Sequence, residues 1–222
     1  MTCQLIFLVF CVLAALHDVI SRQGCCGPQQ WTGVAIQKTG IYNHDLDVAS
    51  IADLITRVSY SYHVKKISIQ RMVHNITTNK KDKIHKIFDY NQGIEYTITN
   101  GKYCTSNPTS GAMWQNCIPD NSTYFGSYNV SGPMIDVYRV VTPSGATIRV
   151  GVTPDSCHPV FESLLISGPV YTLEISVYEN VTMGISYPSD FDVPEFCHHN
   201  QIKKKYVSST ITELIHSSFS WR

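Results

Sequence analysis

The sequence has little charge, few long hydrophobic runs and no net charge of either sign. Asp, Glu, Lys and Arg make up 15% of the 222 residues, whereas about a quarter is usual. Its 17 acidic and 17 basic side chains cancel, so no electrostatic field collects phosphate backbones and nucleic-acid binding is not expected. A hydrophobic fraction of 43% with 13 tyrosines excludes a disordered chain. These numbers are typical of one globular domain.

The motifs of common catalytic sites are also absent. The nearest approach to a serine nucleophile elbow, Gly184-Ile185-Ser186-Tyr187-Pro188, lacks the second glycine. The chain contains no P-loop, no dinucleotide fingerprint and no His-Glu-X-X-His pair. Cys157-His158 and Cys197-His198-His199 could supply a nucleophile or zinc ligands, but thiols in an oxidising compartment are usually bridged. We therefore expect a protein that is not an enzyme and requires no cofactor.

The one long hydrophobic run stands near the amino terminus. Leu5–Leu16 is twelve residues long, and such a helix rises only about 18 Å, too short for a hydrocarbon core of about 30 Å. Its length and position predict a secretory signal peptide over residues 1–21, with cleavage between residues 15 and 24. A buried amino-terminal helix is the alternative. No later stretch approaches the roughly 18 apolar residues of a membrane helix, so no transmembrane segment is expected.

Cysteines and glycosylation sequons agree with the secretory pathway. Cys3 and Cys11 would leave with the signal peptide, and the other six cysteines form an even set that predicts up to three disulfide bonds. Their spacing alone does not decide how they pair. The six are Cys25, Cys26, Cys104, Cys117, Cys157 and Cys197. Four Asn-X-Ser/Thr sequons predict N-linked glycans at Asn75, Asn121, Asn129 and Asn180.

Two-residue alternation of apolar and polar side chains predicts an antiparallel all-β protein of about eight to eleven strands. Turn residues around Gly93 and Gly145 predict hairpins. The segment between Cys104 and Tyr128 is long, irregular and rich in proline and glycine, and such a loop usually has its own restraint or a function. Strands are expected over residues 31–38, 58–64, 66–73, 83–90, 94–99, 135–141, 147–152 and 171–178.

Two groups of acidic residues could bind calcium. Oxygen ligands at alternating positions suit this ion, but neither group matches an EF-hand loop, and solvated loop carboxylates are the alternative. The candidates are Asp45 and Asp47 in one group and Asp190, Asp192 and Glu195 in the other.

Four blocks, taken in order, resemble the ependymin-related proteins. The first is Cys25-X-X-Pro28-Gln29-Gln30-Trp31-X-Gly33, and the second is Phe88-Asp89-Tyr90 with Gly93 and the strand that leads into Cys104. Asp155-Ser156-Cys157-His158-Pro159-Val160 and the stretch from Tyr187 to Cys197 are the third and fourth. The resemblance covers residues 25–199, nearly all of the mature chain.

This resemblance implies two stacked antiparallel sheets curved around a deep apolar pocket, similar to bacterial lipoprotein carriers. It also implies a secreted or lysosomal glycoprotein, often dimeric, that binds lipids. Calcium binding and cell–matrix adhesion are attributed to the family as well. Its common bridges correspond to Cys25–Cys157 and Cys104–Cys197, and we expect the remaining Cys26 and Cys117 to pair. The expected domain covers residues 25–200, followed by a helical tail over residues 201–222.

Two functions are considered. The first is a non-enzymatic binder of a lipid or another hydrophobic ligand, and the second is a structural glycoprotein with extracellular-matrix contacts and no specific small ligand. For the first, the ligand is expected between the sheets, on one face of the alternating strands. The candidate pocket residues are Val58, Tyr60, Tyr62, Ile94, Tyr96, Ile98, Ile148, Val150, Leu173 and Ile175.

Overall fold

The structure is a computed structural model that describes residues 24–109, 111–113, 115–129, 132, 134–142 and 144–199. The predicted signal peptide and the predicted tail over residues 201–222 lie outside these residues. The all-β prediction is confirmed, since eleven strands form one antiparallel sheet. They are followed by a 3₁₀ turn, η1 (Pro188–Phe191), and a short helix, α2 (Glu195–His199).

The strands form two meanders that are joined through the first and last strands of the chain. Strand order in the sheet is β6-β5-β4-β3-β2-β1-β11-β10-β9-β8-β7, so β1 and β11 lie side by side at the centre. The bounds are β1 (Gln30–Asn43), β2 (Val48–Ser61), β3 (Lys66–Asn75), β4 (Lys80–Asp89), β5 (Ile94–Thr99), β6 (Tyr103–Pro108), β7 (Thr123–Asn129), β8 (Met134–Val141), β9 (Thr147–Val152), β10 (Pro159–Ile166) and β11 (Val170–Met183).

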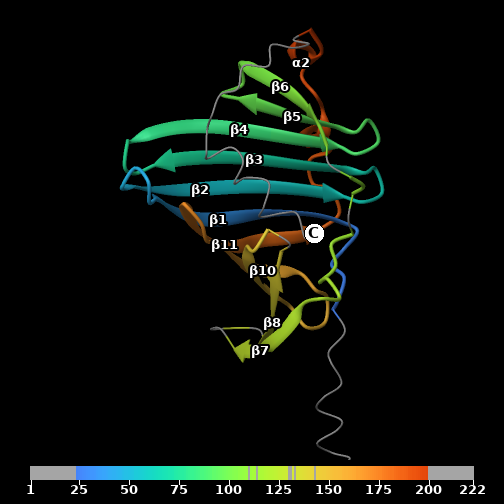
Figure 1. Ribbon diagram of the computed structural model, residues 1–222. Coiled ribbons are helices and arrows are strands. Elements are labelled where there is room, and N and C mark those ends of the chain that lie inside the picture. Colours follow the sequence, from blue (N-terminus) through green and yellow to red (C-terminus); the bar gives the residue numbers. More distant parts are fainter. Residues whose placement is uncertain are drawn as a thin grey trace, which may run out of the picture.

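We call β1–β6 the first half and β7–β11 the second half of the sheet. In Figure 1, β1 to β4 and β11 run as long neighbouring arrows, whereas β10, β8 and β7 turn away from that direction. The two sheets implied by the family resemblance are therefore two halves of one continuous, curved sheet.

Alternation does not predict β6, β7 and β10, because apolar and polar side chains alternate only weakly in these three strands. β6 and β7 are the two edges of the sheet, and most of their side chains are exposed. An edge strand with two wet faces needs no apolar period. β10 has an irregular register between Pro159 and Phe161. In contrast, the predicted strand over residues 58–64 runs too far, since β2 ends at Ser61 and residues 62–65 form a turn.

The hairpin predicted around Gly93 is present between β4 and β5. The Asp89 carboxylate accepts hydrogen bonds from the backbone N–H groups of Asn91 (3.0 Å) and Gln92 (3.1 Å). Gly93 follows with φ of +67°, a value that glycine adopts without a steric penalty. Local turn chemistry thus fixes this connection.

Three disulfide bonds join Cys25 to Cys157, Cys26 to Cys117 and Cys104 to Cys197, the expected pairs. The Cys26–Cys117 bridge restrains the long connection that carries the chain from one edge of the sheet to the other. Backbone hydrogen bonds from Gly27 to Asn116 and from Ile118 to Cys25 reinforce it. We call the end of the sheet closed by the bridges of Cys25 and Cys26 the disulfide end, and the opposite end the hairpin end.

The register defines two faces of the sheet. The inner face carries Ala35, Val58 and Val150, and the outer face carries Ile36 and Ile175. Among the described residues, the buried apolar side chains of the inner face form two separate clusters. The first-half cluster contains Trp31, Ala35, Val58, Tyr60, Ile67, Ile69, Met113 and Tyr178. The second-half cluster contains Ile118, Tyr138, Val140, Ala146, Ile148, Val150, Val152, Cys157 and Leu164.

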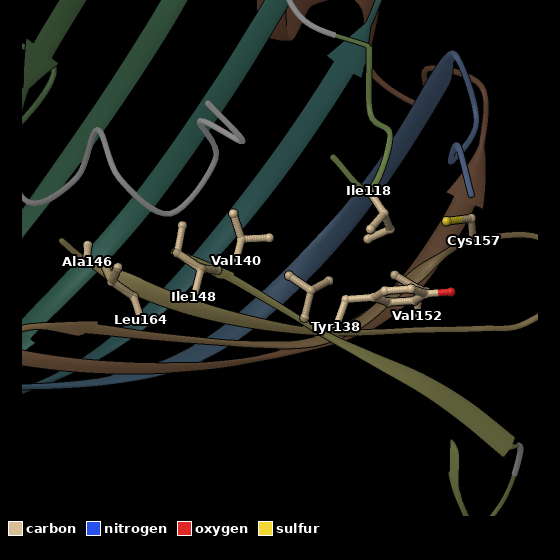
Figure 2. Packing of buried hydrophobic residues seen from close by; sticks show 9 residues of the cluster. Ile118, Tyr138, Val140, Ala146, Ile148, Val152, Cys157 and Leu164 are labelled. Atoms are coloured by element: carbon tan, nitrogen blue, oxygen red, sulfur yellow. The ribbon is translucent and has the colours of Figure 1, made fainter. Parts of the chain in front are cut away.

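Figure 2 shows the second-half cluster from close by. Val140 and Ile148 point toward the side on which the strands of the first half pass, and Ile118 joins them from the long connection. A third cluster lies on the outer face, where Phe196 and Cys197 pack on residues of β4, β5 and β6.

Candidate ligand-binding face

The central strand β11 places its polar side chains on the inner face and its apolar side chains on the outer face. Glu174 and Ser176 are buried with 4% and 1% of their surface exposed, whereas Leu173 and Ile175 are each 47% exposed. The sequence predicts this alternation, but the expected position of Leu173 and Ile175 on the ligand-binding face is wrong. A strand with one wet and one dry face normally buries its apolar side chains, so the buried polar groups must have partners.

Those partners come from neighbouring strands and form a polar band across the inner face. Gln37 Nε2 donates to Glu174 Oε1 (2.9 Å) and to Ser176 Oγ (2.8 Å), and Thr39 Oγ1 donates to Glu174 Oε2 (3.1 Å). Thr56 donates to the Gln37 side-chain carbonyl and accepts from Arg71 Nε at 3.0 Å. The polar band comprises Gln37, Thr39, Thr56, Arg71, Glu162, Glu174, Ser176 and Tyr178.

Burial shifts the proton affinities within this band. The Tyr178 hydroxyl donates to Glu162 Oε2 at 3.3 Å. Desolvation and the neighbouring Glu174 charge raise the pKa of Glu162 well above its ordinary range, so its protonated form is favoured. Burial lowers the pKa of Arg71, and the charges of Glu174, Tyr178 and Glu162 oppose this shift. Burial also raises the pKa of Tyr60, in the adjoining first-half cluster, to about 12.

Three buried polar atoms of the inner face have no hydrogen-bond partner among the described residues. They are Trp31 Nε1, Arg71 Nη2 and Thr172 Oγ1. Buried polar groups in native proteins are nearly always paired, and an exception points to a water, ion or ligand. The inner face thus offers polar contacts that the described residues do not satisfy.

Toward the hairpin end the inner face holds both buried and half-buried apolar residues, and Leu54, the register partner of Val73, is 6% exposed. Leu164 is 1% exposed, and Ile69 is 2% exposed. Closer to the hairpin end lie five half-buried side chains of the same face, one each on β1, β3, β4, β10 and β11. These residues are Ile41, Val73, Ile84, Ile166 and Val170. Half-buried apolar side chains thus lie at the hairpin end of the inner face, whereas two disulfide bridges close the opposite end.

The ten predicted pocket residues do not share one face. Val58, Tyr60, Ile148 and Val150 lie on the inner face within the two buried clusters, and Tyr62 packs on the first of them from the turn after β2. The other five lie on the outer face, which contradicts the expected arrangement. Ile94, Tyr96 and Ile98 are covered by the segment 193–197, and Leu173 and Ile175 are exposed.

Asp190, a calcium candidate, is instead an anchor of the carboxy-terminal segment on the outer face. Its Oδ1 accepts from Arg57 Nη2 (2.7 Å) and Gln70 Nε2 (2.9 Å), and its Oδ2 accepts from Ser59 Oγ (2.8 Å). Its carboxylate therefore receives three hydrogen bonds from protein donors, and calcium binding there stays a prediction. Asp45, Asp47, Asp192 and Glu195 are exposed. The described residues hold no group of three or more His, Cys, Asp or Glu placed to bind a metal.

The sequons differ in accessibility. Asn121, Asn129 and Asn180 are exposed. Asn75 is half-buried, and its Nδ2 donates to Ser50 Oγ at 3.2 Å. Glycan attachment at these four sites stays a prediction.

An all-β protein with an eleven-stranded curved sheet, three disulfide bonds and a buried polar band is the class that these features define. Residues 78–197, more than half of the chain, match the family model described as Ependymin. The chain therefore belongs to the ependymin family, as the sequence blocks predicted.

Curated relatives extend the similarity over most of the chain. Mammalian ependymin-related protein 1 of Mus musculus is 27% identical over 207 residues, which cover 88% of this chain and 86% of the relative. The protein of the same name from Rattus norvegicus is 26% identical over 211 residues, with the same shares covered.

Two solved structures are similar to parts of the sheet. An uncharacterised conserved protein from Thermus thermophilus has a TM-score of 0.48 at 8% identity, covering 76% of this chain and 87% of the other. A LolA superfamily protein from Nitrosomonas europaea has a TM-score of 0.34 at 9% identity, covering 76% and 92%. Within the described residues, no helix has the length and hydrophobicity to cross a membrane.

Proposed function

We propose that this protein is a secreted, non-enzymatic glycoprotein that binds a lipid or another hydrophobic ligand against the inner face of its sheet. The observation that carries the proposal is the divided interior. A solid domain usually has one contiguous core, whereas the described inner-face residues form two apolar clusters with a band of buried polar groups between them. An acyl chain removed from water there would gain about 0.8 kcal/mol per buried methylene.

The hairpin end is the proposed entrance. Val73 and Ile84 are half-buried neighbours on β3 and β4 there, and Ile166 faces the same side from β10. The disulfide end is closed by covalent bridges and by Ile118. A ligand would therefore enter between the hairpins and extend toward the polar band.

The test is lipid extraction combined with one substitution on each face. Organic extract of the purified protein is expected to contain lipid by mass spectrometry. Val73→Trp should fill the space at the entrance and abolish uptake of a neutral fluorescent lipid probe, with little loss of thermal stability. Leu173→Trp, on the exposed outer face, is the matched control and should leave uptake unchanged. Absence of lipid together with full probe uptake by Val73→Trp would contradict the proposal.

The alternative, an adhesive matrix glycoprotein without a small ligand, is favoured by one observation. The outer face exposes a row of apolar side chains that the register places next to one another on four strands. Met72, Ile55, Ile36 and Val177 are 50%, 48%, 48% and 47% exposed. Exposed contiguous apolar surface marks interaction sites.

We propose that this row meets a second copy of the chain, which makes the protein a homodimer. The adjacent row carries Lys38 and Asp53, which form an exposed ion pair. In a two-fold dimer the same two residues could exchange partners between the copies. Val177→Glu should give monomers by analytical ultracentrifugation, while Val141→Glu, also exposed on this face, should not. A wild-type monomer at all concentrations would contradict the dimer.

Calcium binding and an extracellular location belong to this proposal as well. Disulfide bonds persist in oxidising compartments, and the chain has three of them. Asp45 and Asp47 are exposed in the turn between β1 and β2, where solvent oxygen ligands could complete a weak calcium site. Calorimetric titration with calcium, repeated on Asp47→Asn, tests the site: heat that is unchanged by the substitution would contradict it.

A further inference from the structure

Arg71 is a buried cation without a contacting anion. Its side chain is 3% exposed, and its one hydrogen bond among the described residues runs from Nε to Thr56 Oγ1 at 3.0 Å. Nη2 has no partner there. A buried guanidinium that is neither paired nor fully hydrogen-bonded is expensive, because its hydration has been lost without replacement.

The two carboxylates whose charges act on Arg71 have hydrogen-bond donors of their own. Glu174 receives Gln37 Nε2 on one oxygen and Thr39 Oγ1 on the other. Glu162 receives the Tyr178 hydroxyl. Both carboxylates influence Arg71 through their charge, but neither forms an ion pair with it in the described part of the chain. Nη2 of the Arg71 guanidinium can therefore donate to an acceptor outside the described residues.

Arg71 also lies between a buried and a half-buried apolar residue of the inner face of β3. Two residues before it, Ile69 is 2% exposed, and two residues after it on the same face, Val73 is half-buried. Ile84, its direct partner on β4, is half-buried too. An apolar path from the hairpin end thus leads to a cationic group.

We propose that Arg71 binds the anionic oxygens of an amphiphilic ligand, a carboxylate or a phosphate, while the ligand's hydrocarbon chain lies over Val73 and Ile84. This inference rests on the proposed function and names the headgroup class for the same face. Guanidinium matches carboxylate and phosphate in a bidentate geometry, and such charge-assisted pairs are stronger where water is excluded. The bound anion would supply the acceptor for Nη2 that the described residues do not provide.

The experiment compares two ligands with the same chain length and different headgroups. In the assay, stearate and octadecanol each compete with a neutral fluorescent dye for binding to the full-length, delipidated protein. Wild type should prefer stearate by about tenfold or more, the factor expected for one buried charge-assisted hydrogen bond. Arg71→Met should reduce the preference to about one. Arg149→Met, an exposed arginine on the outer face, is the matched control and should keep it.

Further outcomes separate the possible failures. If neither ligand binds to wild type, the proposed function fails and this inference with it. Equal binding of both ligands overturns only the headgroup inference. Inorganic phosphate that raises the Tm of wild type but not of Arg71→Met, without any stearate preference, would indicate a site for a free anion and overturn the amphiphile. A lower Tm of ligand-free Arg71→Met with the stearate preference retained would make Arg71 a structural counter-charge and overturn the proposal.

Discussion

The two faces of β11 differ in the opposite sense from an ordinary strand. On the inner face Glu174 and Ser176 are buried and hydrogen-bonded to Gln37. On the outer face Leu173 and Ile175 are each about half exposed to solvent. The groups that contact each face explain which side chains it carries. The inner face retains polar groups because neighbouring strands supply donors, and the outer face retains apolar groups because, we propose, a second copy covers them. Burial alone is therefore a poor guide to which face binds what.

The largest loss of stability is expected when one donor to the buried Glu174 carboxylate is removed. Gln37→Ala takes away the donor to Glu174 and Ser176 and the acceptor for Thr56. Leaving a buried charge under-satisfied costs about 3 kcal/mol. Urea unfolding should show that loss, whereas Ile175→Ala, half-exposed on the outer face, should lose less than about 1 kcal/mol. Equal losses would mean that the polar band does not stabilise the sheet.

A smaller effect is expected where the outer face is covered by the carboxy-terminal segment. Asp190→Ala removes the acceptor of Arg57, Gln70 and Ser59 and should lower the free energy of unfolding by about 2 kcal/mol. Asp192→Ala, exposed two residues later, is the control and should stay within about 0.5 kcal/mol. Protease should also cut the segment faster in Asp190→Ala. A stability loss in both variants would contradict the anchor role.

The smallest effect concerns Glu162 and depends on pH. Its pKa is raised in the folded state, so the folded form holds the proton more tightly, and wild type loses stability as pH rises above the ordinary carboxyl value toward the raised one. Glu162→Gln cannot lose a proton. The variant should match wild type near pH 4 and exceed it by about 1 kcal/mol at pH 8. Parallel pH profiles in thermal unfolding would show that folding does not raise the pKa of Glu162.

Alternation and turn residues such as Gly93 act locally, and they predicted the fold class and eight of the strands. The cysteine pairs came instead from the family resemblance, which implied two bridges and left Cys26 and Cys117 to form the third. The sequence did not predict the side of each strand. Alternation specifies a period of two, and only the pairing of β11 with β1 shows that Glu174 meets Gln37 and Thr39. Polar residues at matching positions of the first and last strands were the available signal, but without the register they could not be aligned.

The site was predicted less well than the fold for the same reason. The apolar positions of the alternating strands included Leu173 and Ile175, which are exposed, and left out Arg71, which is buried. An arginine within the otherwise apolar period of β3, at Ile67, Ile69 and Val73, was visible in the sequence. Reading such an interruption as a binding residue required knowing that β3 is covered on that face.

Photo-cross-linking shows directly whether the ligand lies on the inner face of the sheet. A stearate carrying a diazirine near the end of its chain would be bound by the full-length protein, irradiated and mapped by peptide mass spectrometry. If the ligand lies on the inner face, labels are expected at Val73, Ile84 or Ile166, which are half-buried there. Labels confined to Leu173, Ile175 or Val177 on the outer face would contradict it.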